Sequence, residues 1–158
     1  MNPAHIHLVF NHLPILGLAF GTVILLVGFF RKDRTVQNTA LLLLVVASLG
    51  AGVAYFSGEE AEDVLEKVPN IPEEYVEDTI KEHEKYAEPF AGIMALVGLI
   101  SLIEFVRRLR GAEGTDSLSQ GLLVLLGFLL LFGSYLAVKT GSSGGLIRHP
   151  EIAQDLLE

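Results

Sequence analysis

Four long runs of apolar residues, separated by short polar segments, dominate this chain. They occupy residues 8–30, 38–56, 89–106 and 118–138. Each run reaches or approaches the roughly 20 residues that a helix needs to cross the hydrocarbon layer of a membrane. The pattern therefore predicts an all-α integral membrane protein in which residues 1–158 form a single four-span transmembrane domain. Because short connections make neighbouring helices antiparallel, we expect a four-helix bundle with up-down-up-down topology.

A charged segment with its own helical pattern separates the second and third apolar runs. It opens with the capping-box sequence Ser57–Glu60, which predicts the N-terminus of a new helix. Apolar and acidic positions then recur at helical spacing up to residue 68 and again over residues 73–88, with two prolines between these stretches. We therefore expect an amphipathic helical hairpin at residues 58–88 that lies across the outer end of the bundle.

Proline and glycine mark the expected limits of the last two spans. Pro89 suits the first turn of a helix, although a helix over residues 73–88 can also continue through it with a kink. Three glycines fall within residues 140–150, directly after the fourth apolar run. They predict a turn that folds back over the outer end of the bundle.

Basic residues flank two of the connections between spans and predict the orientation in the membrane. Short loops rich in Lys and Arg stay in the cytoplasm. Both chain termini and the 58–88 hairpin are therefore expected on the extracytoplasmic side of a bacterial or archaeal-type inner membrane. No basic leader precedes the first span, which we interpret as a retained helix rather than a signal peptide. The basic residues are Arg31, Lys32 and Arg34 after the first span, and Arg107, Arg108 and Arg110 after the third.

One acidic residue, Glu104, lies near the end of the third apolar run. Arg107 and Arg108 follow it at three and four residues, which is the spacing of neighbours on a helix surface. An ordinary surface ion pair is therefore the expected role of Glu104.

All five histidines fall on the side of the membrane that is expected to face outward. Since the chain contains no cysteine, disulfides, cysteine zinc sites and covalent c-type haem attachment are excluded. A neutral imidazole is a common ligand of transition metals and of haem iron. The histidines are His5, His7 and His12 near the start of the first span, His83 before the third span and His149 after the fourth.

Two histidines from separate helices suit a non-covalent b-type haem, and His12 and His83 are the pair that we predict. His12 lies in the first turns of a span, whereas His83 lies on the apolar stripe of the helix that leads into the third span. His7 and His149 are then expected as partners of the haem propionates or as a second site.

Two other interpretations of the histidines stay open at this point. They can enclose a bare transition-metal ion, zinc, copper or iron, together with carboxylates from Glu59, Glu60 or Glu84. They can also serve only as polar anchors at the membrane edge, where polar groups cost little. The spacing matches no compact zinc signature such as His-Glu-x-x-His, so no enzymatic activity is expected.

Short motifs surround these histidines. They are His7–Ile15, Gly58–Glu62, His83-Glu84-x-x-Ala87, and Gly141-x-x-Gly144-Gly145 followed by His149. In combination they make nearly the whole chain resemble a family of four-span bacterial membrane domains of undefined function, which is sometimes fused to c-type cytochrome domains. The resemblance implies His12, His83 and His149 as site residues, and the fusions imply a redox setting. Leu13 and Pro150 depart from the family, which commonly has an aromatic residue and a glycine there.

Together these patterns predict a small membrane protein that holds a redox cofactor for electron transfer. A structural or accessory subunit of a larger membrane complex is the alternative, because the chain has no soluble domain and its helix faces are rich in glycine. The 58–88 segment carries many more carboxylates than lysines, so its field should attract a cationic soluble cytochrome. Membrane lipid and a membrane-bound cytochrome or respiratory-type complex are further expected partners, and nucleic acid is not.

Overall fold

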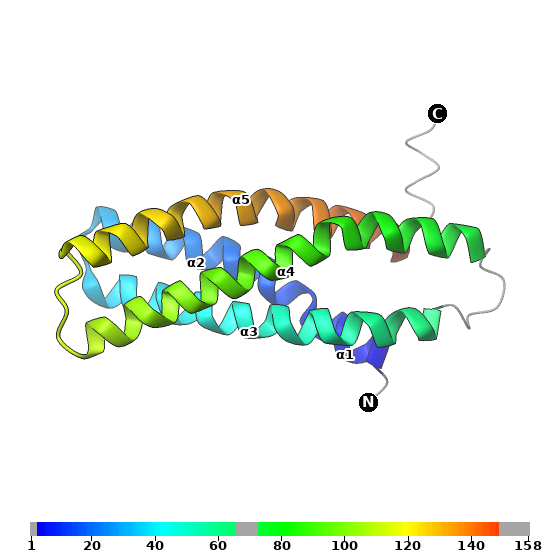
Figure 1. The fold of residues 1–158 in the computed structure, drawn as a ribbon, viewed down its shortest axis with the longest axis horizontal. Helices are drawn as coiled ribbons and strands as arrows, with labels where there is room; N and C mark the ends of the chain where they lie inside the picture. The colour runs from blue at the N-terminus through cyan, green and yellow to red at the C-terminus, as the bar shows by residue number, and fades with distance from the viewer. Residues whose placement is uncertain (1–2, 66–72, 149–158) are drawn as a thin grey trace.

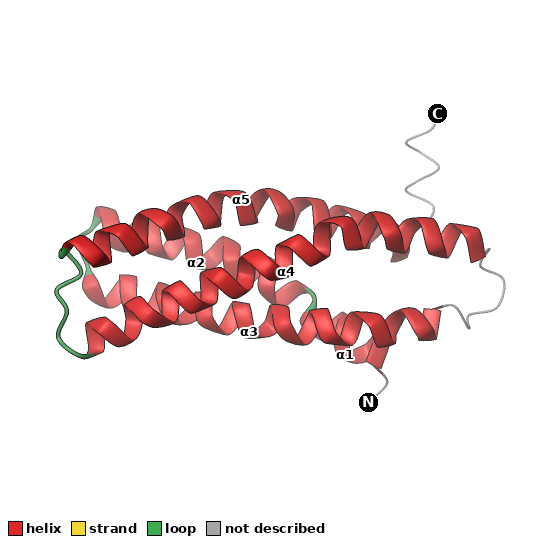
Figure 2. Ribbon diagram, viewed as in Figure 1, coloured by secondary structure: helices red, strands yellow, loops and turns green. Residues whose placement is uncertain are grey.

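The structure is a computed structural model that describes residues 3–65 and 73–148. Within those residues there is no β-strand, and short loops separate the helices (Figure 2). The prediction of an all-α fold is confirmed. The helices are α1 (Pro3–Phe10), α2 (His12–Phe30), α3 (Arg34–Leu65), α4 (Glu73–Leu109) and α5 (Ser117–Arg148).

Four helical stretches are long and apolar enough to cross a membrane, as the sequence predicts. Their long helices lie side by side as a bundle (Figure 1). Large apolar side chains on the outer faces, such as Phe30 and Leu131, are exposed, which suits helices whose outer surface contacts lipid. The four stretches are Ala4–Phe30, Arg34–Val64, Glu74–Leu109 and Ser117–Ile147.

The connections α2–α3 and α4–α5 lie at the same end of the bundle, at the left of Figure 1. Residues 31–33 join α2 to α3, and residues 110–116 join α4 to α5. α1, the C-terminal part of α3 and the N-terminal part of α4 lie at the opposite end. The basic connections and the histidine-bearing helices therefore occupy opposite ends of the molecule.

The first apolar run is divided into two helices at Asn11. Pro14 lacks a backbone N–H, and its ring crowds the carbonyl of Phe10, so the regular helical hydrogen bonds are interrupted there. The Asn11 N–H still donates to the His7 carbonyl at 2.8 Å, so the helical hydrogen-bond pattern of α1 continues as far as Asn11. α1 consequently leaves the line of α2 and packs against α3.

The predicted helix start at Ser57 is wrong. α3 continues without interruption from Arg34 to Leu65, and the Ser57 hydroxyl donates to the Val53 carbonyl at 2.7 Å. A serine that bonds the carbonyl four residues earlier remains inside a helix and does not cap a new one. Extending an existing helix also avoids the cost of nucleating another one. The turn of the expected hairpin, residues 66–72, lies outside the described residues.

The expected glycine turn after the fourth span is wrong as well. α5 runs on through Gly141, Gly144 and Gly145 to Arg148, and α4 likewise continues through Pro89. Each glycine in a helix costs about 1 kcal/mol relative to alanine. Packing against α4 favours the helix here, because a Cβ at Gly144 would lie 3.1 Å from the His83 ring. The glycine thus permits a close approach between two helices.

The core of the bundle lies between helices that follow one another in the chain, with α2 and α5 also in contact. Its most enclosed apolar side chains include Leu18, Leu44, Met94 and Leu126. α3 and α4 approach closely where the Ser48 hydroxyl donates to the Met94 carbonyl at 2.7 Å. This apolar layer separates two polar regions at the ends of the bundle.

Candidate functional site

The histidines occupy the end of the bundle opposite the α2–α3 and α4–α5 connections. His7 and His83 are half-buried, whereas His5 and His12 are exposed. His149 lies outside the described residues. Among the four described histidines, only His7 and His83 therefore combine partial enclosure with defined hydrogen-bond partners.

His7 projects from α1 towards α3. Its Nδ1 atom lies 2.9 Å from the Ala54 carbonyl oxygen. A carbonyl oxygen can only accept, so Nδ1 must carry the hydrogen, and the neutral ring keeps the lone pair on Nε2. The ring lies against Gly58, where a Cβ would be 3.5 Å from its Cε1 atom.

His83 projects from α4 towards α5. Its Nδ1 atom lies 3.2 Å from Ser143 Oγ. The Ser143 hydroxyl donates its single hydrogen to a carbonyl of its own helix, at 2.9 Å for Lys139 or 3.2 Å for Thr140. With the hydroxyl hydrogen used in this way, the Ser143 oxygen accepts from His83, and the neutral ring then carries hydrogen on Nδ1 and the lone pair on Nε2.

The two imidazoles are held by different pairs of helices. His7 is fixed by the α1–α3 pair and His83 by the α4–α5 pair. Two buried polar atoms of this end, Asn11 Oδ1 and Thr140 Oγ1, have no hydrogen-bond partner among the described residues. Asn11 lies one turn after His7, and Thr140 lies one turn before Gly144. This end of the bundle thus has unsatisfied polar groups around two oriented imidazoles.

The predicted pair His12 and His83 is not brought into contact by any interaction of the described residues. His12 is exposed at the start of α2, whereas His83 is held by α5. No three side chains of His, Cys, Asp or Glu converge in the part of the chain that is described. The carboxylates considered as additional metal ligands, Glu59, Glu60 and Glu84, are all exposed.

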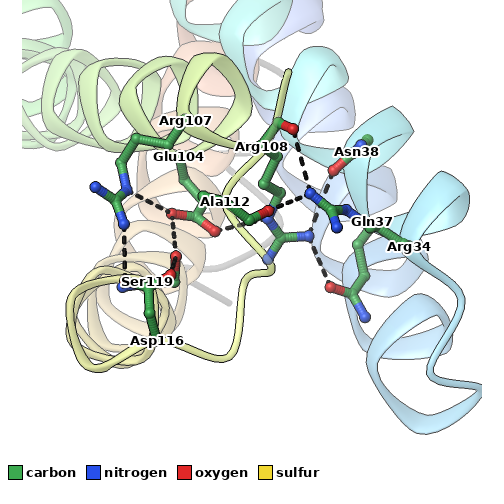
Figure 3. Close-up of polar contacts among 9 residues, drawn as sticks. All are labelled: Arg34, Gln37, Asn38, Glu104, Arg107, Arg108, Ala112, Asp116 and Ser119. Atoms are coloured by element: carbon green, nitrogen blue, oxygen red, sulfur yellow. Dashed lines mark hydrogen bonds and ion pairs between the residues drawn. The ribbon is translucent and has the colours of Figure 1, made fainter. Parts of the chain in front are cut away.

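The opposite end of the bundle holds a buried charged cluster around Glu104 (Figure 3). The expectation of an ordinary surface pair is wrong, because Glu104 is 0% exposed and the Arg108 side chain only 2%. Arg108 Nε donates to Glu104 Oε1 at 2.6 Å, and the Ser119 hydroxyl lies 3.0 Å from Glu104 Oε2. Intramembrane charges of this kind are enclosed by partners because hydrocarbon cannot solvate them.

The charged cluster joins three helices. From α4, Arg108 Nη1 donates to Gln37 Oε1 on α3 at 2.8 Å. From α3, Arg34 Nη2 donates to the backbone carbonyls of Arg108, at 3.2 Å, and of Ala112. These bonds tie α3 to the C-terminal end of α4 and to the connection that follows it.

Asp116 extends the charged cluster to the surface and caps α5. Its Oδ1 atom accepts from the Ser119 N–H at 3.1 Å and from Arg107 Nη2 at 2.7 Å. These hydrogen bonds from Ser119, together with the charge of Arg107, lower the pKa of Asp116 below its ordinary value. The sequence signal that was missed is Asp116 at the N-cap position, directly before the fourth apolar run.

Neither the histidine end nor the charged cluster can be assigned by similarity. No protein-family model, no curated protein and no solved structure matches this chain. The resemblance to four-span bacterial membrane domains therefore remains a prediction from the motifs.

Proposed function

We propose that this chain is a small integral membrane protein that holds a histidine-ligated redox cofactor, a b-type haem, for electron transfer. The observation that carries the proposal is that the His7 and His83 rings share the same partial burial and the same kind of contact at Nδ1. Each ring is half-buried, and its Nδ1 atom lies within hydrogen-bond distance of an oxygen of a neighbouring helix; in the tautomer with hydrogen on Nδ1, each ring keeps its Nε2 lone pair. Histidines that bind metals are usually oriented in this way, by a hydrogen bond from the other ring nitrogen.

His7 and His83 are the ligand pair that we propose, in place of His12 and His83. Both rings are partly enclosed, and they come from opposite helix pairs, as ligands on two faces of a flat group must. Gly58 and Gly144 let the rings lie directly against the backbone of the neighbouring helices. His12 and His149 remain the alternatives, as ligands or as partners of the propionates. The iron of a bound haem would supply one-electron chemistry.

The proposed setting is the inner membrane of a bacterial or archaeal-type cell, with up-down-up-down topology and both termini extracytoplasmic. The supporting observation is that Arg31, Lys32 and Arg110 lie beside the two connections at one end, which suits a cytoplasmic face. The acidic segments at the other end suit a cationic soluble cytochrome or a respiratory-type complex as redox partner.

A spectrum of the purified protein tests the proposal. We expect a Soret band with the low-spin signature of two imidazole ligands, and loss of that signature in His7→Ala and in His83→Ala. His5→Ala is the control, because His5 is exposed. Loss in His12→Ala with retention in His7→Ala would instead support the His12–His83 pair.

Elemental analysis of the same sample separates the remaining possibilities. Stoichiometric zinc, copper or non-haem iron without a Soret band would replace the haem by a bare metal ion. Absence of both would overturn the cofactor proposal and favour an accessory subunit of a larger membrane complex.

A further inference from the structure

The charged cluster at the end opposite the histidines has more positive than negative groups. Its ionised side chains are three guanidinium groups, Arg34, Arg107 and Arg108, and two carboxylates, Glu104 and Asp116. Both carboxylates contact arginines of α4, whereas Arg34 donates only to backbone carbonyls. The exposed Arg34 is therefore the one positive group of these five side chains that contacts no carboxylate among the described residues.

Two hydrogen-bond donors of this cluster also lack acceptors. Arg108 Nη2 and Arg107 Nε are buried and have no hydrogen-bond partner among the described residues, although Arg107 Nε lies 3.7 Å from Glu104 Oε2 in an ion pair. The Arg108 side chain is 2% exposed, so water around the protein does not solvate its free donor. A buried donor without an acceptor is costly, and it is more costly when the group is charged.

The connection between α4 and α5 lies against the Arg108 guanidinium without supplying an acceptor. At Gly114, where φ is 75°, a Cβ would lie 3.2 Å from Arg108 Nη2. Gly111 has a positive φ of 99° as well. Because Gly114 has no side chain, its backbone lies directly against the guanidinium. Movement of residues 110–116 would expose the unpaired Arg108 Nη2 to a ligand.

We propose that the charged cluster binds the phosphate group of an anionic membrane lipid between Arg34 and Arg108. A phosphate oxygen supplies both the missing negative charge and the missing acceptor, and guanidinium groups bind phosphates through paired hydrogen bonds. The cluster lies at the end of the apolar spans, which is the level of lipid headgroups. Exposed Arg31 and Lys32 on the neighbouring connection add to the attraction for an anionic headgroup. This site is independent of the histidines and of any cofactor.

Native mass spectrometry of the full-length protein from mixed micelles tests the lipid site. The probe is phosphatidylglycerol mixed with an equal amount of phosphatidylcholine. We expect the wild type to retain one phosphatidylglycerol, and Arg34→Gln to bind it about fivefold more weakly, the change expected for one lost charge. Arg34→Lys should recover part of this binding, because lysine keeps the positive charge. The recovery should be incomplete, because lysine lacks the planar guanidinium that makes paired hydrogen bonds to a phosphate.

Arg31→Gln is the matched control, because Arg31 lies at the same end and is exposed. Equal weakening in Arg31→Gln and Arg34→Gln would overturn the site and indicate general surface attraction. No preference for phosphatidylglycerol in the wild type would also overturn it. Displacement of the lipid by millimolar inorganic phosphate would overturn the assignment to a lipid and identify a site for free anions.

Discussion

Arg108 Nε lies 2.6 Å from Glu104 Oε1, and both side chains are enclosed within the bundle one helical turn apart on α4. The pair is held from α5 by Ser119 and from α3 by Gln37. Since both charges are removed from water, each of them depends on the other for compensation.

Removing one member of this pair should therefore destabilise the bundle. We expect Arg108→Met to lower the free energy of unfolding by about 3 kcal/mol, because it leaves the buried Glu104 with only the longer ion pair to Arg107, at 3.7 Å. The double variant Glu104→Gln/Arg108→Met should recover a large part of that loss. Unfolding by denaturing detergent measures both, with Arg110→Met, at an exposed position, as the control. A single variant as stable as the control would contradict the role of the pair.

The contact between Ser48 and Gly98 gives a second prediction. A Cβ at Gly98 would overlap the Ser48 side chain, whereas a Cβ at Gly92 would meet nothing within 4 Å. We expect Gly98→Ala to separate α3 from α4 and to cost about 1–3 kcal/mol of stability. Gly92→Ala, on the same helix, should be neutral or slightly stabilising because alanine favours the helix. Equal thermal stability of the two variants would show that the helices do not pack as described.

Asp116 should make the stability of the basic end depend on pH. Its pKa is lowered in the folded protein by the hydrogen bonds from Ser119 and the charge of Arg107, so its contribution is complete above the unfolded value. That contribution is lost as the pH falls through the lower, folded pKa. The midpoint temperature of thermal unfolding, measured from about pH 7 down to about pH 3, should fall less steeply in Asp116→Asn than in the wild type. Identical slopes would contradict this role.

Ser143 should position His83 if the proposed cofactor is bound. Ser143→Ala removes the side-chain hydrogen-bond partner of His83 Nδ1 and so fixes the orientation of the imidazole less firmly. Loss of such a hydrogen bond typically weakens metal affinity by 10–100-fold. Titration of the protein with haem measures the affinity, and Ser134→Ala is the control because its hydroxyl bonds only within α5. Unchanged affinity in Ser143→Ala would argue against His83 as a ligand.

The apolar runs of the sequence determined the four spans. A segment of that length and composition can satisfy its backbone hydrogen bonds in a membrane only as a helix, whatever its neighbours are. The break near Pro14 was also predictable, because proline removes a donor wherever it stands in a helix. The gathering of basic residues at one end followed from the positions of Arg31 and Arg110 beside the connections.

Tertiary structure alone decided where the helices end and which side chains they enclose. The capping sequence at Ser57 and the glycine at position 144 each favour a helix end by about 1 kcal/mol. Continued packing along a neighbouring helix outweighs preferences of that size. Periodicity placed His83 on an apolar stripe but gave no partner for its ring, because Ser143 is 60 residues away in the chain. Glu104 is enclosed for the same reason, since only the arrival of α3 and α5 separates it from solvent.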